Sequence, residues 1–108
     1  MNDPNVQSTP PLTGKVALIT GAARRVGAEI AHRFHAAGAN VLVHCNRSLD
    51  EAERLVAQLE ARRAGSAAAV SLDLLETAKL GLLVETAQRR FGRLDILVNN
   101  ASTFYPDR

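Results

Sequence analysis

The stretch that decides the fold of this chain is Val16-Ala17-Leu18-Ile19-Thr20-Gly21-Ala22-Ala23-Arg24-Arg25-Val26-Gly27. Its first four residues form a continuous apolar run, which is typical of a strand buried on both faces of a parallel sheet. From Val26 onward apolar residues recur at helical spacing, and Gly38 ends the helix. A turn between a strand and a helix N-terminus presents backbone N–H groups and the positive end of the helix to a phosphate. The stretch therefore predicts a strand, a phosphate-binding loop and a helix.

The same alternation continues outward from this stretch. The expected strands are Val16–Ile19, Val41–Val43, Ala67–Leu72 and Leu94–Val98, and the expected helices are Val26–Ala37, Leu49–Ala64 and Glu76–Phe91. The apolar residues expected on the buried helix faces include Val26, Ile30, Phe34 and Ala37 in the first helix and Leu80, Leu83, Val84, Ala87 and Phe91 in the third. Strand and helix in this rhythm require right-handed crossovers and a parallel sheet. We expect an α/β fold, a Rossmann-type doubly wound parallel sheet of strand order 3-2-1-4, incomplete because such domains normally have more strands.

Length and composition bound the class of protein. The 108 residues suffice for one small domain, and 13 basic against 11 acidic residues give a net charge of +2 without a run of one sign. This balance favours neither a nucleic-acid partner nor a membrane partner. Residues 1–14 are polar and rich in proline, so we expect a disordered lead followed by a domain over residues 15–108. Cys45 is the only cysteine, and we find no signal sequence, which together predict a cytoplasmic protein.

The loop after the first strand carries glycines and arginines at positions suited to a pyrophosphate. Gly21 permits a tight turn, and Gly27 lets the helix pack closely on the sheet. Arg24 and Arg25 stand at the mouth of this turn. If no ligand binds, the glycines serve packing alone and the arginines are solvated surface charges.

The residues after the second strand bear on the choice of dinucleotide. A carboxylate there selects NAD through the ribose 2′-hydroxyl, whereas an arginine accommodates the 2′-phosphate of NADP. This chain has Asn46, Arg47 and Ser48 at that place and no acid before Asp50, so we expect NADP(H). Ser48 with Glu51 also fits a capping box for the next helix, a role that is compatible with phosphate binding.

Three stretches of the chain resemble a known family. The loop resembles the T-G-x-x-x-G-x-G pattern of short-chain dehydrogenases/reductases, with Arg25 in place of the middle glycine, as in the T-G-A-A-[RK]-R-x-G loop of pteridine reductases. The segment from Asp95 to Ala101 resembles the family's D-x-L-V-N-N-A-G signature, and Ser102 replaces its last glycine. The run from Asn99 to Pro106 resembles the N-N-A-S-[ST]-F-Y-P run of pteridine reductases. The resemblance covers the chain from Lys15 and implies reduction of a dihydropterin or dihydrofolate by NADPH.

The loop geometry and the resemblance together give the candidate site residues. The cofactor-binding candidates are Gly21, Arg24, Arg25, Val26, Gly27, Asn46, Arg47, Ser48, Asp73, Asn100, Ala101 and Ser102. The substrate-binding candidates are Arg25, Ser102 and Phe104, whose ring is expected to stack on the pterin. Asp73 has an alternative role as a cap for the following helix or turn. By resemblance, Asn99 helps to fix the central sheet.

The remaining expectations concern what the chain lacks. The family's proton-donating Y-x-x-x-K pair has no match, since Tyr105 is the only tyrosine, so we expect no catalytic residue in this chain. We expect an N-terminal part of a pteridine reductase, inactive by itself, whose full-length form is a homotetramer. His32 and His35 lack a third ligand for a metal, so we expect them to face solvent and expect no metal site. The alternatives are a general carbonyl or 3-oxoacyl reductase of the same family and a non-catalytic nucleotide-binding module.

Overall fold

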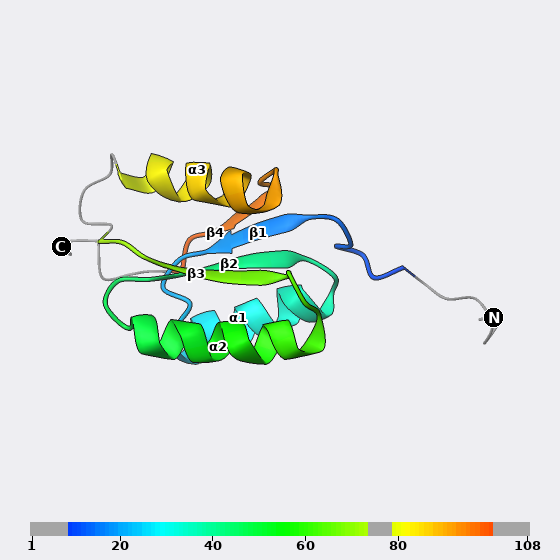
Figure 1. Cartoon of the computed structure of the whole chain (residues 1–108), viewed down its shortest axis with the longest axis horizontal. Helices are drawn as coiled ribbons and strands as arrows, with labels where there is room; N and C mark the ends of the chain where they lie inside the picture. The colour runs from blue at the N-terminus through cyan, green and yellow to red at the C-terminus, as the bar shows by residue number, and fades with distance from the viewer. Residues whose placement is uncertain (1–8, 74–78, 101–108) are drawn as a thin grey trace.

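The structure is a computed structural model in which residues 9–73 and 79–100 are described. Strands and helices alternate along the chain, in the order β1 Val16–Ile19, α1 Arg25–Ala36, β2 Asn40–Cys45, α2 Leu49–Arg62, β3 Ala67–Ser71, α3 Leu80–Phe91 and β4 Ile96–Val98. The strands form one parallel sheet of order β3-β2-β1-β4, which confirms the predicted topology. Figure 1 shows three layers, with α1 and α2 on one face of the sheet and α3 on the other.

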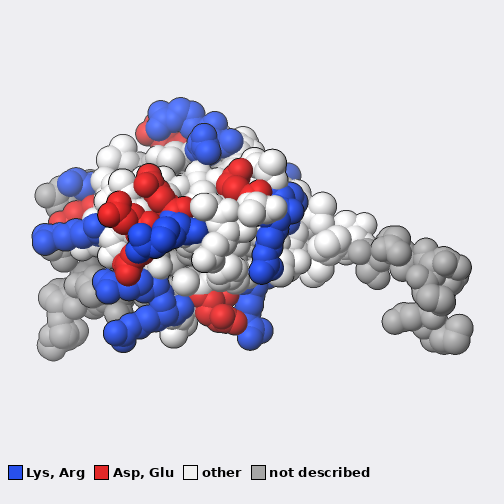
Figure 2. All heavy atoms as spheres, turned by 60° about the horizontal axis from the view of Figure 1, so that its bottom comes forward, with Lys and Arg blue, Asp and Glu red and all other residues white. Residues whose placement is uncertain are grey.

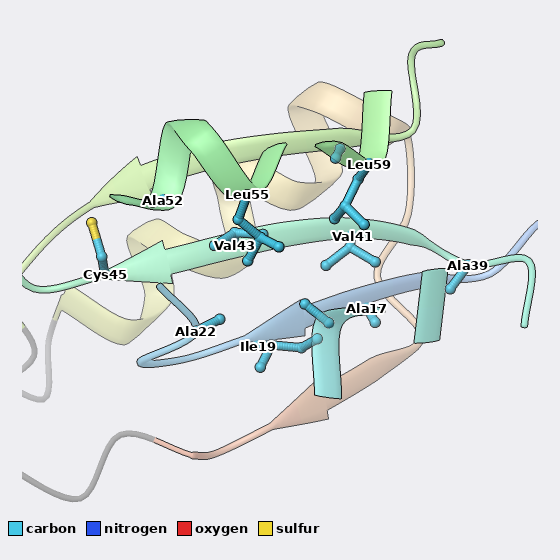
Figure 3. Close-up of a cluster of buried hydrophobic side chains, with 12 residues drawn as sticks. Ala17, Ile19, Ala22, Ala39, Val41, Val43, Cys45, Ala52, Leu55 and Leu59 are labelled. Carbon is cyan, nitrogen blue, oxygen red and sulfur yellow. The ribbon is translucent and has the colours of Figure 1, made fainter. Parts of the chain in front are cut away.

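Alternating side chains of the central strands supply a core on each face of the sheet. Ile19, Val41 and Val43 pack toward α1 and α2, where they meet Leu55 and Leu59 of α2 (Figure 3). Leu18 and Leu42 belong to the second cluster, on the α3 side, and are almost fully buried. Because both faces are covered, β1 reads in the sequence as the continuous apolar run that predicted it.

The buried face of α1 differs from the prediction. Its fully buried residues are Gly27, Ala31 and His35, whereas Val26 is 65% exposed. The helix approaches the sheet through small residues, so the larger Ile30 and Phe34 pack only along its flanks. The expectation that Val26 points inward is therefore wrong.

Two further side-chain predictions are corrected. His35, expected to face solvent, is 2% exposed, because Ser66 offers its ring a hydrogen-bond partner (Nε2 to Oγ, 2.6 Å). Leu80, expected to face inward, is 37% exposed at the start of α3, where the helix has only begun to cover the sheet. The predicted start of that helix at Glu76 lies outside the described residues.

The segment before Lys15 is also more structured than expected. Residues 11–14 form a turn, in which the Lys15 N–H donates to the Leu12 carbonyl. The Leu12 N–H in turn donates to the carbonyl of Ala37 at the end of α1, over 2.8 Å. The disordered lead is thus wrong for this turn, because it pairs a backbone group that the helix end leaves open. Residues 1–8 of the predicted lead lie outside the described residues.

The surface over α1 and α2 carries basic and acidic side chains next to one another (Figure 2). Within residues 9–73 and 79–100, no helix combines the length and the apolar character that crossing a bilayer requires.

Candidate cofactor-binding site

The candidate residues gather at one edge of the sheet. Parallel strands all end at the same edge, so the residues after β1, β2, β3 and β4 come together there (Figure 1). The chain continues from β1 to β2 on one side and from β3 back to β4 on the other, so the strand order reverses beside β1. Open α/β sheets bind ligands at this switch point, outside the carboxyl ends of the strands.

The phosphate loop is held to the end of β4. The Asn100 side chain donates from Nδ2 to the Gly21 carbonyl at 3.0 Å, and the Asn100 N–H donates to Thr20 Oγ1 at 2.9 Å. The Thr20 hydroxyl also lies 3.3 Å from Oδ1 of Asn99. Asn100, a cofactor-binding candidate, therefore contacts the loop backbone itself, and Asn99 joins the ends of β1 and β4.

Gly27 brings the first turn of α1 against this loop. A Cβ at Gly27 would lie 2.3 Å from the Gly21 carbonyl oxygen and 2.6 Å from Nδ2 of Asn100, far inside contact distance. The glycine is thus required by close approach, as its place in the sequence predicted. Because the turn packs so tightly, the N–H groups at the start of α1 stand directly beside the loop.

Arg25 and Val26 lie at the open side of the loop. Arg25 has φ +56°, and among the described residues it is the one residue other than glycine with positive φ. This left-handed conformation costs an L-residue about 1–2 kcal/mol, whereas glycine adopts it freely. Both side chains are exposed. Such strain is concentrated at functional sites, where another interaction compensates for it.

Arg24 joins the loop to the start of α2. Its Nε forms an ion pair with Glu51 at 3.0 Å, and its Nη2 lies 3.5 Å from Ser48 Oγ, at the limit of a hydrogen bond. Two cofactor-binding candidates from different loops, Arg24 and Ser48, are thereby brought together. Asn46 and Arg47, in the same loop, are exposed.

The expected capping box of α2 does not form. Ser48 is the N-cap residue, but its side chain makes no capping hydrogen bond. Its hydroxyl faces Arg24 instead, and Glu51 pairs with the same guanidinium rather than reaching back to the cap. The tertiary partner from the phosphate loop therefore replaces the local interaction that the sequence suggested.

His44 is a site residue that the sequence analysis did not select. It is the fifth residue of β2, 1% exposed, and its Nδ1 accepts a hydrogen bond from the Gly21 N–H at 3.0 Å. Its Nε2 lies 2.6 Å from the Leu72 carbonyl at the end of β3. Burial lowers the pKa of His44, although the bond to Leu72 opposes the shift. The only signal in the sequence was a histidine placed directly after the apolar run Val41–Val43.

The other candidates divide by position. Asp73 is half-buried two residues after β3, six positions before Lys79, the N-cap residue of α3. Ala101, Ser102 and Phe104 lie outside the described residues. Within the described ranges, no cluster of three His, Cys, Asp or Glu residues is arranged to hold a metal ion.

This arrangement defines a class of protein, the Rossmann-type nucleotide-binding α/β domains: a parallel sheet of order 3-2-1-4 with a glycine turn from β1 into α1. Residues 15–107 match the short chain dehydrogenase family, and the chain belongs to that family. Membership implies a site for a nicotinamide nucleotide cofactor.

The relatives of the chain are diverse. It is 41% identical over 111 residues to pteridine reductase 1 of Leishmania tarentolae, which aligns 87% of this chain with 38% of that protein. It is 44% identical over 94 residues to galactitol 2-dehydrogenase of Agrobacterium fabrum, covering 86% of this chain and 34% of the relative. It is 39% identical over 92 residues to hydroxynaphthalene reductase-like protein Arp2 of Metarhizium robertsii, covering 85% and 34%. The chain thus spans little more than a third of the length of these relatives.

Proposed function

We propose that this chain is the cofactor-binding part of an NADPH-dependent pterin reductase. The observation that carries the proposal is Arg25, a cationic residue that occupies the family's glycine position and keeps the left-handed backbone of a glycine. A selected function explains why a residue that is strained there is present. A guanidinium at the mouth of the phosphate loop can pair with the cofactor phosphates and donate to a flat, polar heterocycle.

The preference for NADP(H) rests on the loop between β2 and α2. Arg47 of this loop and Arg24, which reaches it from the phosphate loop, supply positive charge, and Ser48 supplies a hydroxyl. The carboxylate of Glu51 lies beside Arg24, and its ion pair with Arg24 offsets its charge. When NADPH binds, N–H groups of the Arg24 guanidinium would donate hydrogen bonds to its 2′-phosphate.

The reaction would be transfer of a hydride, which NADPH supplies when bound, to a dihydropterin or dihydrofolate. Arg25 would orient the pyrophosphate and the substrate, with Ser102 and Phe104 completing the pterin site, as the resemblance to pteridine reductases implies. These 108 residues contain no Y-x-x-x-K pair, so we expect them to bind NADPH without turning it over. We also propose that the whole protein is a homotetramer, on the resemblance alone, and that it is cytoplasmic, on the single cysteine of these 108 residues.

A second candidate function is a general reductase or dehydrogenase of the same family. The similarity to galactitol 2-dehydrogenase, higher in identity than that to pteridine reductase 1, favours it. The third possibility, a non-catalytic nucleotide-binding module, shares the cofactor site and differs in having no substrate.

Binding of NADPH and NADH to the chain, followed by nicotinamide fluorescence, tests the cofactor proposal. We expect NADPH to bind at least tenfold more tightly, and R24A and R47A each to reduce that preference. The control is R33A, which breaks an exposed Arg33–Glu29 ion pair of 2.8 Å further along α1 and should leave both affinities unchanged. Equal binding of NADH and NADPH would contradict the NADP assignment.

The substrate proposal needs a separate measurement. Dihydrobiopterin should bind the NADPH-loaded chain, and R25A should weaken that binding. A preference for galactitol over dihydrobiopterin would instead favour the general dehydrogenase, and no binding of either would favour the non-catalytic module.

A further inference from the structure

The backbone of Gly21 is hydrogen-bonded to residues at or just beyond the ends of both strands that neighbour β1 in the sheet. Its N–H donates to Nδ1 of His44 at the end of β2, and its carbonyl accepts from Nδ2 of Asn100 after β4. The neighbouring Ala22 N–H donates to the His44 backbone carbonyl at 2.8 Å. The first turn of the phosphate loop is therefore bonded to both strands that flank β1.

We infer that His44 is a positioning residue for the cofactor, whose imidazole fixes the phosphate loop in its binding conformation by holding the Gly21 N–H. The inference rests on the proposed function for the identity of the ligand, a nicotinamide dinucleotide. It deepens that proposal, because His44 contacts the loop and not the cofactor.

The two hydrogen bonds define one tautomer of the ring. Nδ1 accepts from an N–H group, so it carries no proton, and Nε2 must then carry the proton that is donated to the Leu72 carbonyl. The ring is neutral in this state and fully satisfied by two backbone partners. A side chain that is 1% exposed with both nitrogens bonded keeps a single orientation, so it can fix the atoms it holds.

These bonds also divide the loop into two parts. The N–H groups of Gly21 and Ala22 are used by His44, so they are directed at the sheet and not at a phosphate. The donors for the pyrophosphate must then come from the following residues, at the start of α1. Because Gly21 and Ala22 are held to the sheet, the N–H groups at the start of α1 have a fixed position relative to it.

Two amide substitutions separate the two bonds of the ring. Asn places a polar atom where Nδ1 stands and cannot reach Leu72, whereas Gln reaches the place of Nε2 and leaves the Gly21 N–H unpaired. H44N and H44Q each lose one hydrogen bond, so similar losses of stability are expected from both. Their difference in cofactor affinity therefore reports on the Gly21 bond alone.

The test compares the chain with its H44N and H44Q variants, using NADPH titration together with the urea midpoint of each protein. We expect H44N to bind NADPH within about threefold of the unsubstituted chain and H44Q to bind about tenfold more weakly. H44Q binding as tightly as H44N, with both folded, would overturn the inference.

Amide hydrogen exchange at Gly21 keeps the inference separate from the proposed function. If the unsubstituted chain binds neither NADPH nor NADH, the proposed function fails, and exchange still tests the positioning role. Exchange at Gly21 that is at least tenfold faster in H44Q than in H44N supports that role, and equal exchange overturns it.

Discussion

Arg25 combines an exposed charge with a backbone conformation that disfavours any side chain. R25G should remove the left-handed strain, and R25A should retain it while also losing the guanidinium. In urea titrations we expect the free energy of unfolding of R25G to be about 1 kcal/mol higher than that of R25A. The difference is no larger because the greater flexibility of glycine in the unfolded chain offsets part of the strain that is removed. Both variants should weaken NADPH binding equally, because both lack the charge. Equal stability of R25G and R25A would show that the conformation carries no cost.

Gly27 and Gly81 are both helical glycines, but they face different surroundings. A Cβ at Gly27 would overlap the Gly21 carbonyl oxygen, whereas a Cβ at Gly81 meets nothing within 4 Å. We expect G27A to lower the free energy of unfolding by about 1–3 kcal/mol, because backbone must shift. The matched control G81A should raise it by about 0.5–1 kcal/mol, because alanine is the better helix former. Thermal or urea unfolding measures both, and a stabilised G27A would contradict the close approach.

Arg63 connects the ends of two helices at the scale of whole elements. It follows α2, and its guanidinium donates to the carbonyl of His35, in the last turn of α1, at 3.2 Å and to the carbonyl of Ala39, beyond the end of α1, at 2.6 Å. A cation at a helix C-terminus satisfies open carbonyls and opposes the negative end of the helix dipole. The pair of bonds fixes α1 against α2 at the edge opposite the cofactor loops.

R63M should therefore destabilise the fold while keeping the aliphatic part of the side chain. We expect a loss of about 1–3 kcal/mol in the free energy of unfolding, since two buried carbonyls lose a charged donor. R62M, at the exposed last residue of α2, is the matched control and should change stability by less than about 0.5 kcal/mol. Similar midpoints for the two variants would mean that Arg63 does not cap α1.

Asp95 fixes the register of β4 beside β1. Its carboxylate accepts the Val16 N–H at 2.8 Å, and its own N–H donates to the Val16 carbonyl at 2.9 Å. Arg93 pairs with the same carboxylate. The pKa of Asp95 is held below its ordinary range, mainly by the hydrogen bond from Arg93 and secondly by that from Val16. Asp95 therefore joins the start of β4 to β1 through both its carboxylate and its backbone N–H.

The stability of the whole molecule should depend on two buried imidazoles. Burial is the main cause that lowers the pKa of His35 and of His44, and Arg63 and Arg62 add to the effect at His35. The unfolded chain, with histidine pKa values of about 6.5, then takes up protons before the folded chain does as the pH falls. This contribution to stability is complete above pH 6.5 and is lost as the pH falls through the lowered values.

Urea unfolding at a series of pH values between 8 and 5 measures this dependence. The free energy of unfolding should decline below about pH 6.5, and the decline should be smaller in the H35Q/H44N variant, which lacks both rings. At still lower pH a second loss is expected, because backbone N–H groups of Gly65 and Ala67 lower the pKa of Glu60. Stability that is constant from pH 8 to pH 5 would contradict the histidine assignment.

The sequence by itself determined the order of the elements, the parallel sheet and the glycine turn. These follow from local signals: a buried strand must be apolar throughout, and a helix shows its period and its stop signals within a few residues. The same reason made the loop residues predictable from the sequence, among them Gly21, Gly27 and the arginines, because their places relative to β1 and α1 are set by chain order.

Only the tertiary structure decided which side chains meet. Arg24 pairs with Glu51 rather than leaving it to a capping box, and His44 reaches Gly21 across 23 positions of sequence. Ser66 bonds the ring of His35 and Arg63 donates to its carbonyl, whereas the pattern of its own helix predicted that His35 faces solvent. Periodicity reports the face on which a residue lies, but a hydrogen bond depends on distances set by how two elements pack, and no local pattern carries that information.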